Sequence, residues 1–509
     1  MKKMVLFFLL VALPVCLPAQ EGVSGKYEKF ILTPPAPRSP RINGPAVYGL
    51  RPGSPLIYRI PCTGKHPVTF GADNLPQGIT LDRERGILRG AVAKRGKYEI
   101  TFVAENKYGK FSRRFTLVVG DTLALTPPMG WNSWYIHYDR VSDRIMREAA
   151  DQMIASGMAD YGYQYVNIDD CWTRKVHSDD PVLGGPLRDN NGVLLPNGRF
   201  PDMRGLAAYI HSRGLKAGLY ISPGPATCAG YAGSWSHEAT DAATFARWGF
   251  DFLKYDWCSY GKVAGNKKDP DYYIRPYRLM WNELQKQDRD IVLNLCQYGM
   301  GKVWEWGAQV GNCWRTTGDL GLEKRRDLPG FYTIGFSNAR HAAYAGPGGW
   351  NDPDYILIGW VGDAHGMSEG KPTDLTPWEQ YSYMSFWSLM AAPLIFSGDM
   401  AKLDRFTLNV LCNREVIAVD QDPLGKQGVI IEKKRDHFIM KKPLADGSLA
   451  VGIFNLKNKP EKLAVSWNRL GIEGEKEVRD LWRQKDLGSF STKFTTPVRP
   501  HGVRLVRIY

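Results

Sequence analysis

The spacing of apolar residues changes along the chain, and each change predicts a different kind of domain. Between residues 46 and 120, apolar and polar positions alternate in short runs, such as 56–60, 97–104 and 111–119. Turn signals rich in Asn, Pro and Gly separate these runs, as at 74–78. Alternation with a period of two over this length predicts a small β-sandwich of immunoglobulin (Ig) type.

Residues 125 to 405 follow a different pattern, in which amphipathic helical segments alternate with short apolar runs. The runs 164–168, 215–221 and 250–255 are predicted strands, and the helical periodicity predicts helices at 144–156, 204–213 and 241–248. Repeated units of this kind predict a (β/α)8 TIM barrel, whose active sites lie at the C-terminal ends of the strands. From 406 to 509 the period returns to two, which predicts a C-terminal antiparallel β-sandwich.

The N-terminus has the pattern of a secretory signal peptide. Lys2 and Lys3 precede an apolar stretch from 4 to 15, and residues 1–19 would be removed by cleavage after Ala19. A lipoprotein anchored at Cys16 is the less favoured alternative, because Pro14 and Val15 make a poor lipobox. We therefore expect an exported protein, periplasmic or secreted. Residues 20–45, rich in Pro, Gly and Ser, are predicted to be a loose leader.

Composition narrows the functional classes. The chain has 509 residues and a net charge of +14, but Lys and Arg are dispersed, with no stripe that would indicate nucleic-acid binding. No second stretch approaches the ~20 apolar residues of a membrane span. Sixteen Trp and 25 Tyr could stack on sugar faces or fill cores. No Cys or His cluster has metal-ligand spacing, so we expect no metal or cofactor.

Carboxylates beside cations follow several of the predicted strands. Asp256 ends one strand, and Lys254, two residues earlier, points to the same face, where its charge should keep the carboxylate ionised. Asp319 lies four residues after Arg315 in a Gly-containing loop. Each could be an ordinary strand-end ion pair or a helix cap. Glycoside hydrolysis, however, requires two carboxyl groups that face the bond to be cleaved, and these two residues could supply them.

The segments 126–134, 165–172, 199–201, 214–220, 254–256, 313–319, 348–354 and 415–425 together resemble glycoside hydrolase family 27, in the order of that family. The first reads Thr-Pro-Pro-Met-Gly-Trp-Asn-Ser-Trp, and the one at 313–319 reads Cys-Trp-Arg-Thr-Thr-Gly-Asp. The family contains α-galactosidases (melibiases) and α-N-acetylgalactosaminidases. The resemblance covers residues 125 to 509. The N-terminal module lies outside it and is similar to Ig-like modules attached to secreted enzymes.

The resemblance implies a retaining double displacement that releases terminal α-galactose, with Asp256 as nucleophile and Asp319 as acid/base. It also implies a disulfide between Cys228 and Cys258 beside the site. The positions that match substrate-binding residues are Asp169 and Asp170 for O4 and O6, Lys254 for O3 and O4, Arg315 and Asp354 near O2 and the anomeric carbon, and Trp134 and Tyr220 as an aromatic wall.

Three departures from the family pattern leave the exact sugar open. Gln297-Tyr298 stands where many members have Glu-Trp, Tyr355 where Met is common, and Trp257 where Gly or Asn is usual. Gln297 would still offer an amide to a hydroxyl at C2. The alternatives are a β-L-arabinopyranosidase or an α-N-acetylgalactosaminidase and, in another class, a non-catalytic carbohydrate-binding protein. The sequence predicts no oligomeric state.

Overall fold

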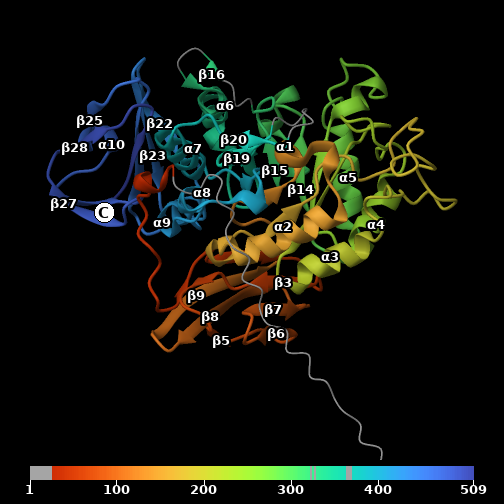
Figure 1. Cartoon of the computed structure of the whole chain (residues 1–509), viewed down its shortest axis with the longest axis horizontal. Helices are drawn as coiled ribbons and strands as arrows, with labels where there is room; N and C mark the ends of the chain where they lie inside the picture. Colours follow the sequence, from red (N-terminus) through yellow and green to blue (C-terminus); the bar gives the residue numbers. More distant parts are fainter. Residues whose placement is uncertain (1–25, 321–323, 326–327, 363–368) are drawn as a thin grey trace, which may run out of the picture.

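Three units make up the computed structural model, which describes residues 26–320, 324–325, 328–362 and 369–509. In Figure 1 the N-terminal β-sandwich (red to orange) lies below the barrel, and the C-terminal β-sandwich (blue) lies to its left. Within the described residues, no helix combines the length and apolar character needed to cross a membrane. The predicted fold class, a TIM barrel flanked by two β-sandwiches, is confirmed.

Eight parallel strands form the barrel, and their order in the sheet is β18-β15-β14-β13-β12-β11-β10-β21. A parallel bridge between Ile356 and Phe396 joins the chain after β18 to β21 and closes the sheet. The strands are almost continuously buried, as expected when helices cover a parallel sheet. They are β10 (Met129–Asn132), β11 (Tyr165–Asn167), β12 (Lys216–Ile221), β13 (Phe252–Asp256), β14 (Val292–Cys296), β15 (Cys313–Arg315), β18 (Trp350–Asp352) and β21 (Leu394–Phe396).

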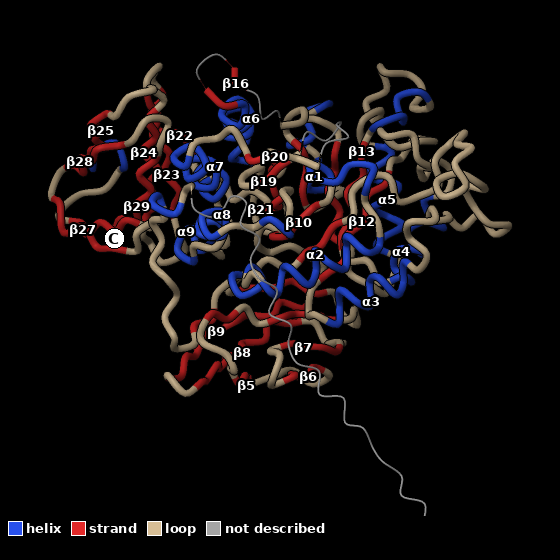
Figure 2. The backbone as a smooth tube through the Cα atoms, viewed as in Figure 1, coloured by secondary structure: helices blue, strands red, loops and turns tan. Residues whose placement is uncertain are grey.

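Helices surround these strands (Figure 2). Several begin at a side-chain cap: Ser142 accepts from the N–H of Ile145, and Thr376 forms a capping box with Glu379. The predicted helices at 144–156, 204–213 and 241–248 are confirmed to within a few residues. The helices are α1 (Trp134–His137), α2 (Asp143–Ala155), α3 (Met203–Ser212), α4 (Glu238–Trp248), α5 (Arg275–Gln285), α6 (Gly330–Asn338) and α7 (Pro377–Leu389).

The C-terminal sandwich begins later than the apolar pattern predicted. Residues 405–420 form two helices, α8 (Arg405–Leu411) and α9 (Arg414–Asp420), because Asp404 and Asn413 cap their N-termini. The strands follow as a six-stranded sheet and a two-stranded sheet. They are β22 (Val429–Lys433), β23 (His437–Pro443), β24 (Leu449–Asn455), β29 (Val503–Ile508), β26 (Lys476–Asp480) and β27 (Lys485–Phe490), then β25 (Glu461–Ser466) and β28 (Lys493–Val498).

The N-terminal module is a sandwich of a four-stranded and a three-stranded sheet. Its strands are β2 (Val47–Leu50), β9 (Gly109–Val119), β8 (Gly96–Asn106) and β5 (Thr69–Asp73), facing β3 (Leu56–Arg59), β7 (Ile87–Gly90) and β6 (Ile79–Asp82). Arg51 fixes it to the barrel by donating to the Asp290 carboxylate and to the carbonyls of Gln285 and Gln287. Asp290 precedes β14, so the module covers the N-terminal end of the barrel, opposite the end where active sites form.

The expectation of a loose leader at 20–45 is wrong for the part that the structure describes. The N–H of Leu32 donates to the Tyr381 hydroxyl, and Asn409 receives from and donates to the backbone of Thr33. Further on, β1 (Arg41–Ile42) pairs with β4 (Cys62–Thr63). Side-chain anchors of this kind carry no periodic sequence signal, and they hold the segment to α7 and α8.

Candidate active site

A cavity of about 120 Å³ opens at the C-terminal ends of the barrel strands. Four carboxylates, two cations and several aromatic rings surround it, and they come from strand ends or from the segments that follow them. Its lining consists of Trp134, Tyr135, Asp169, Tyr220, Cys228, Lys254, Asp256, Tyr298, Arg315, Asp319, Asp354 and Tyr355.

Asp256 ends β13 and is almost completely buried, with 5% of its surface exposed. The Tyr298 hydroxyl donates to Oδ1 at 2.5 Å, and the Tyr220 hydroxyl donates to Oδ2 at 3.2 Å. Burial raises the pKa of Asp256 to about 6, although the Lys254 charge and the Tyr298 hydrogen bond oppose the rise. The carboxylate is therefore mostly ionised at neutral pH but takes up a proton in mild acid.

Lys254 has a different main partner from the one predicted. Its Nζ donates to Asp169 Oδ2 at 2.9 Å, across the barrel mouth at the end of β11. The same oxygen accepts from Asn132 Nδ2 at 2.8 Å and from the Tyr355 hydroxyl at 3.1 Å. Burial favours the neutral amine, yet nearby carboxylates, Asp169 foremost, raise the pKa of Lys254 well above its usual value. A charged lysine and carboxylate thus face the cavity as one donor–acceptor unit.

Arg315 organises the opposite wall. Its guanidinium, 3% exposed, donates to the Gly318 carbonyl at 2.8 Å and lies 3.2 Å from carboxylate oxygens of both Asp319 and Asp354. Asp354 Oδ2 also accepts from the Leu320 N–H at 2.8 Å, so the loop that carries Asp319 is tied down on both sides. The Asp319 side chain itself remains 58% exposed. Of the four carboxylates, Asp319 is therefore the solvent-accessible one, whereas Asp169, Asp256 and Asp354 are buried.

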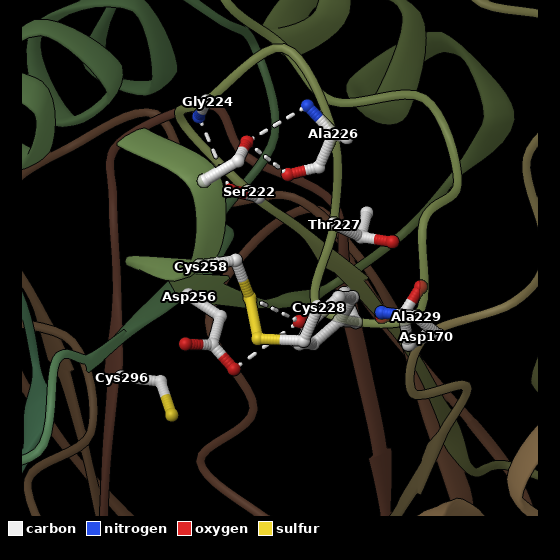
Figure 3. The surroundings of a disulfide bond; sticks show 12 residues. Asp170, Ser222, Gly224, Ala226, Thr227, Cys228, Ala229, Asp256, Cys258 and Cys296 are labelled. Carbon is white, nitrogen blue, oxygen red and sulfur yellow. Dashed lines mark hydrogen bonds between the residues drawn. A yellow bond between two sulfur atoms is a disulfide. The ribbon is translucent and has the colours of Figure 1, made fainter. Parts of the chain in front are cut away.

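A disulfide joins Cys228 to Cys258 next to the Asp256 carboxylate, as predicted (Figure 3). Cys258 lies two residues after the end of β13, and Cys228 lies in the loop after β12, so the bond fixes that loop beside the cavity. Each sulfur contacts one of the tyrosines that bind Asp256: Cys258 Sγ lies 3.1 Å from the Tyr220 hydroxyl, and Cys228 Sγ lies 3.5 Å from the Tyr298 hydroxyl. The disulfide is therefore packed into the surroundings of the carboxylate.

Four non-glycine residues that lie within four positions of the end of a barrel strand have positive φ angles, which cost free energy for L-residues. They are Cys171 (76°), Cys258 (29°), Tyr298 (64°) and Asp354 (82°). Each follows a barrel strand by a few residues. Unfavourable backbone conformations kept at one end of a barrel are typical of sites where side-chain direction matters more than local stability.

Eight of the ten predicted site residues line the cavity, and two do not. Both Asp170 oxygens accept backbone N–H groups, Oδ1 from Cys171 and Oδ2 from Ala229, so this carboxylate secures the Cys228 loop. Gln297 is fully buried, and neither polar atom of its side chain has a hydrogen-bond partner among the described residues. Tyr135, Tyr298 and Tyr355 line the cavity without having been predicted as site residues. Tyr298 and Tyr355 had appeared only as departures from the family pattern.

Comparison with known proteins places this geometry in a family. Residues 126–422 match the family described as Alpha galactosidase A, and residues 435–508 match the Alpha galactosidase C-terminal beta sandwich domain. Residues 39–120 match an Ig domain family.

The relatives cover most of the chain. Alpha-galactosidase 3 of Arabidopsis thaliana is 38% identical over 74% of this chain and 81% of that protein. The crystal structure of alpha-galactosidase I from Mortierella vinacea is 31% identical, covers 76% of this chain and 97% of that one, and superposes with a TM-score of 0.67. A solved Bacteroides fragilis protein is 34% identical, covers 92% of this chain and 98% of that one, and gives a TM-score of 0.84. The chain therefore belongs to the alpha-galactosidase A (melibiase) family, that is, glycoside hydrolase family 27.

Proposed function

We propose that this protein is an exo-acting α-galactosidase that releases terminal α-D-galactose from oligo- or polysaccharides with retention of configuration. The observation that carries the proposal is the pair Asp256 and Asp319, one buried and one exposed, on a single cavity. A buried carboxylate held by hydroxyl donors suits a nucleophile, and a solvent-accessible one suits proton exchange with the leaving group and water.

The reaction takes two steps. In the first, an Asp256 oxygen attacks C1 while Asp319 gives its proton to the departing glycosidic oxygen, which leaves a covalent glycosyl-enzyme. In the second, the Asp319 carboxylate takes a proton from water, the water oxygen attacks C1, and the bonding electrons return to Asp256. Arg315 holds the loop of Asp319 in place for both proton transfers.

The sugar is recognised by the side of the cavity that carries Asp169 and Lys254, which faces the Arg315 side. Asp169 and Lys254 offer a charged acceptor and a charged donor to adjacent hydroxyls, and such bonds are stronger than neutral ones. The rings of Trp134 and Tyr220 add apolar surface for the sugar face. Tyr298 lines the cavity while Gln297 does not, so a bulky ring faces the sugar instead of the small residues that an N-acetyl group would need.

The test is hydrolysis of aryl α-D-galactopyranoside beside aryl β-L-arabinopyranoside and aryl α-N-acetylgalactosaminide. We expect the galactoside to have the highest kcat/KM. Preference for either other substrate would keep the roles of Asp256 and Asp319 but assign another sugar. Binding of galactose without turnover of any substrate would indicate that the protein is a non-catalytic carbohydrate-binding protein.

We also propose that the protein is exported, to the periplasm or beyond, after removal of residues 1–19. Lys2 and Lys3 before an apolar run support this, and so does the Cys228–Cys258 disulfide, because disulfides persist mainly in oxidising compartments. N-terminal sequencing of the protein from cell fractions tests it. A mature chain starting at Gln20 is expected, whereas a cytoplasmic protein that keeps Met1 would contradict it.

A further inference from the structure

The Asp256 carboxylate has two hydroxyl donors, and their contacts differ. Tyr298 binds Oδ1 at 2.5 Å, which is at the short end for an O–H···O⁻ bond, whereas Tyr220 binds Oδ2 at 3.2 Å. Nothing in the family resemblance assigns a hydroxyl to position 298, since the matching pattern there is Cys-Glu-Trp. The short bond is therefore a contact that the family resemblance does not assign.

The backbone conformation of the turn after β14 directs the Tyr298 side chain toward the Asp256 carboxylate. Its φ of 64° is unfavourable for a tyrosine, and Gly299 follows with a φ of 83°. A Cβ at Gly299 would lie 2.3 Å from the Thr316 carbonyl oxygen, so only glycine lets this turn approach the loop between Arg315 and Asp319. The turn after β14 is thus held against β15, and the Tyr298 ring projects across to the end of β13.

We propose that Tyr298 is a positioning residue for the two-step reaction: its hydroxyl fixes Asp256 by Oδ1 and leaves Oδ2 as the oxygen that bonds to C1. The proposal rests on the function proposed above. When Oδ2 attacks C1, Oδ1 becomes the carbonyl oxygen of the ester, and the Tyr298 hydroxyl remains its donor. When water displaces the ester, the electron pair returns to the carboxylate.

This hydrogen bond acts differently on the two steps. A hydroxyl binds a carboxylate more strongly than an ester carbonyl, because the charge-assisted bond is the stronger one. The Tyr298 bond therefore stabilises Asp256 as a leaving group in the second step, and it makes the same carboxylate a slightly weaker nucleophile in the first. Loss of the hydroxyl should slow breakdown of the glycosyl-enzyme more than its formation.

The test is Tyr298→Phe, assayed with an aryl α-galactoside whose good leaving group makes the first step fast. We expect kcat to fall about tenfold to hundredfold, the range for removing a hydrogen bond to a charged group. KM should fall as well, because the glycosyl-enzyme accumulates, and mass spectrometry of the working enzyme should detect the added galactosyl group. The acid limb of kcat/KM should move to higher pH, because the hydrogen bond that lowers the pKa of Asp256 is gone.

A matched control is Tyr355→Phe, which also removes one hydroxyl from the cavity wall, but one that binds Asp169 Oδ2 at 3.1 Å. It should raise KM and leave the acid limb of kcat/KM in place. Tyr298→Trp keeps an aromatic ring without the phenol, and it serves if the Phe variant folds poorly.

Two results would overturn the proposal for Tyr298. One is a Tyr298→Phe enzyme with wild-type kcat and pH profile. The other is a loss of kcat with an unmoved acid limb and an unchanged or raised KM, which would indicate a structural role only. Failure of the wild type to cleave any aryl α-galactoside would instead refute the proposed function, so the two failures are distinct.

Discussion

Burial of the ionised Asp256 carboxylate should lower the free energy of unfolding of the wild-type protein. Asp256→Asn should therefore be more stable than the wild type at neutral pH. In the folded chain the pKa of Asp256 is raised from 3.8 to about 6. A rise of this size corresponds to about 3 kcal/mol of unfavourable free energy in the ionised folded state. Asn has nearly the same shape and can still accept a hydrogen bond from Tyr298, but it carries no charge to bury.

The pH dependence fixes the sign of the effect. Well below pH 3.8 the carboxyl is protonated in both the folded and the unfolded chain, so it costs nothing. As the pH rises from 4 to 6, the unfolded chain loses this proton before the folded chain does, and folding stability falls. Above pH 6 the full cost is present. Asp256→Asn should therefore be close to the wild type in folding stability at pH 4 and clearly more stable than the wild type at pH 7.5.

Scanning calorimetry of the barrel transition at the two pH values is the assay. At pH 7.5 we expect a melting temperature higher by on the order of 5–10 °C, the shift that about 3 kcal/mol produces in a domain of this size. The matched control is Asp319→Asn, whose side chain is 58% exposed and keeps its hydration in the folded protein. It should lose activity without a comparable shift. An Asp256→Asn protein that melts at or below the wild type at pH 7.5 would refute the reasoning.

Three other changes test further parts of the structure. Lys254→Met leaves the buried Asp169 carboxylate without its cation, which should abolish sugar binding and cost about 3–5 kcal/mol of stability, measured by calorimetry and by galactose titration; an unchanged affinity would contradict the donor role. Arg51→Ala, at the far end of the barrel, should lower the melting temperature or separate a second transition while kcat/KM stays at the wild-type value; a large loss of activity would contradict that separation. Replacing Cys228 and Cys258 with Ser opens a loop of 30 residues, which should cost about 3–4 kcal/mol and lower kcat by misplacing Tyr220; full activity would show that the disulfide serves stability alone.

The sequence predicted the barrel and its strand ends well because local pattern decides them. Strands such as β12 and β13 are buried along their whole length, so their apolar runs stand out. Once the alternation of strands and helices was recognised, Asp169, Asp256 and Arg315 had to lie at one end of the barrel.

Contacts across the barrel could not be predicted in this way. Lys254 and Asp256 share a strand face, which suggested that they pair, but the long lysine side chain reaches the end of β11 instead. The bond from Tyr298 to Asp256 depends on the turn after β14, whose direction comes from positive φ angles and no hydrophobic periodicity. The segment at 26–45 and the helices at 405–420 depend on single polar anchors and helix caps. Such single residues do not change the local composition, so the composition does not predict them.

The central claim is that Asp256 and Asp319 cleave an α-galactoside by double displacement, and the anomer that is first released tests it most directly. Proton NMR during hydrolysis of an aryl α-D-galactopyranoside distinguishes α- from β-galactose before mutarotation mixes them. Double displacement predicts α-galactose as the first product, since two displacements at C1 restore the configuration. First release of β-galactose would mean a single displacement by water and would contradict the nucleophilic role of Asp256.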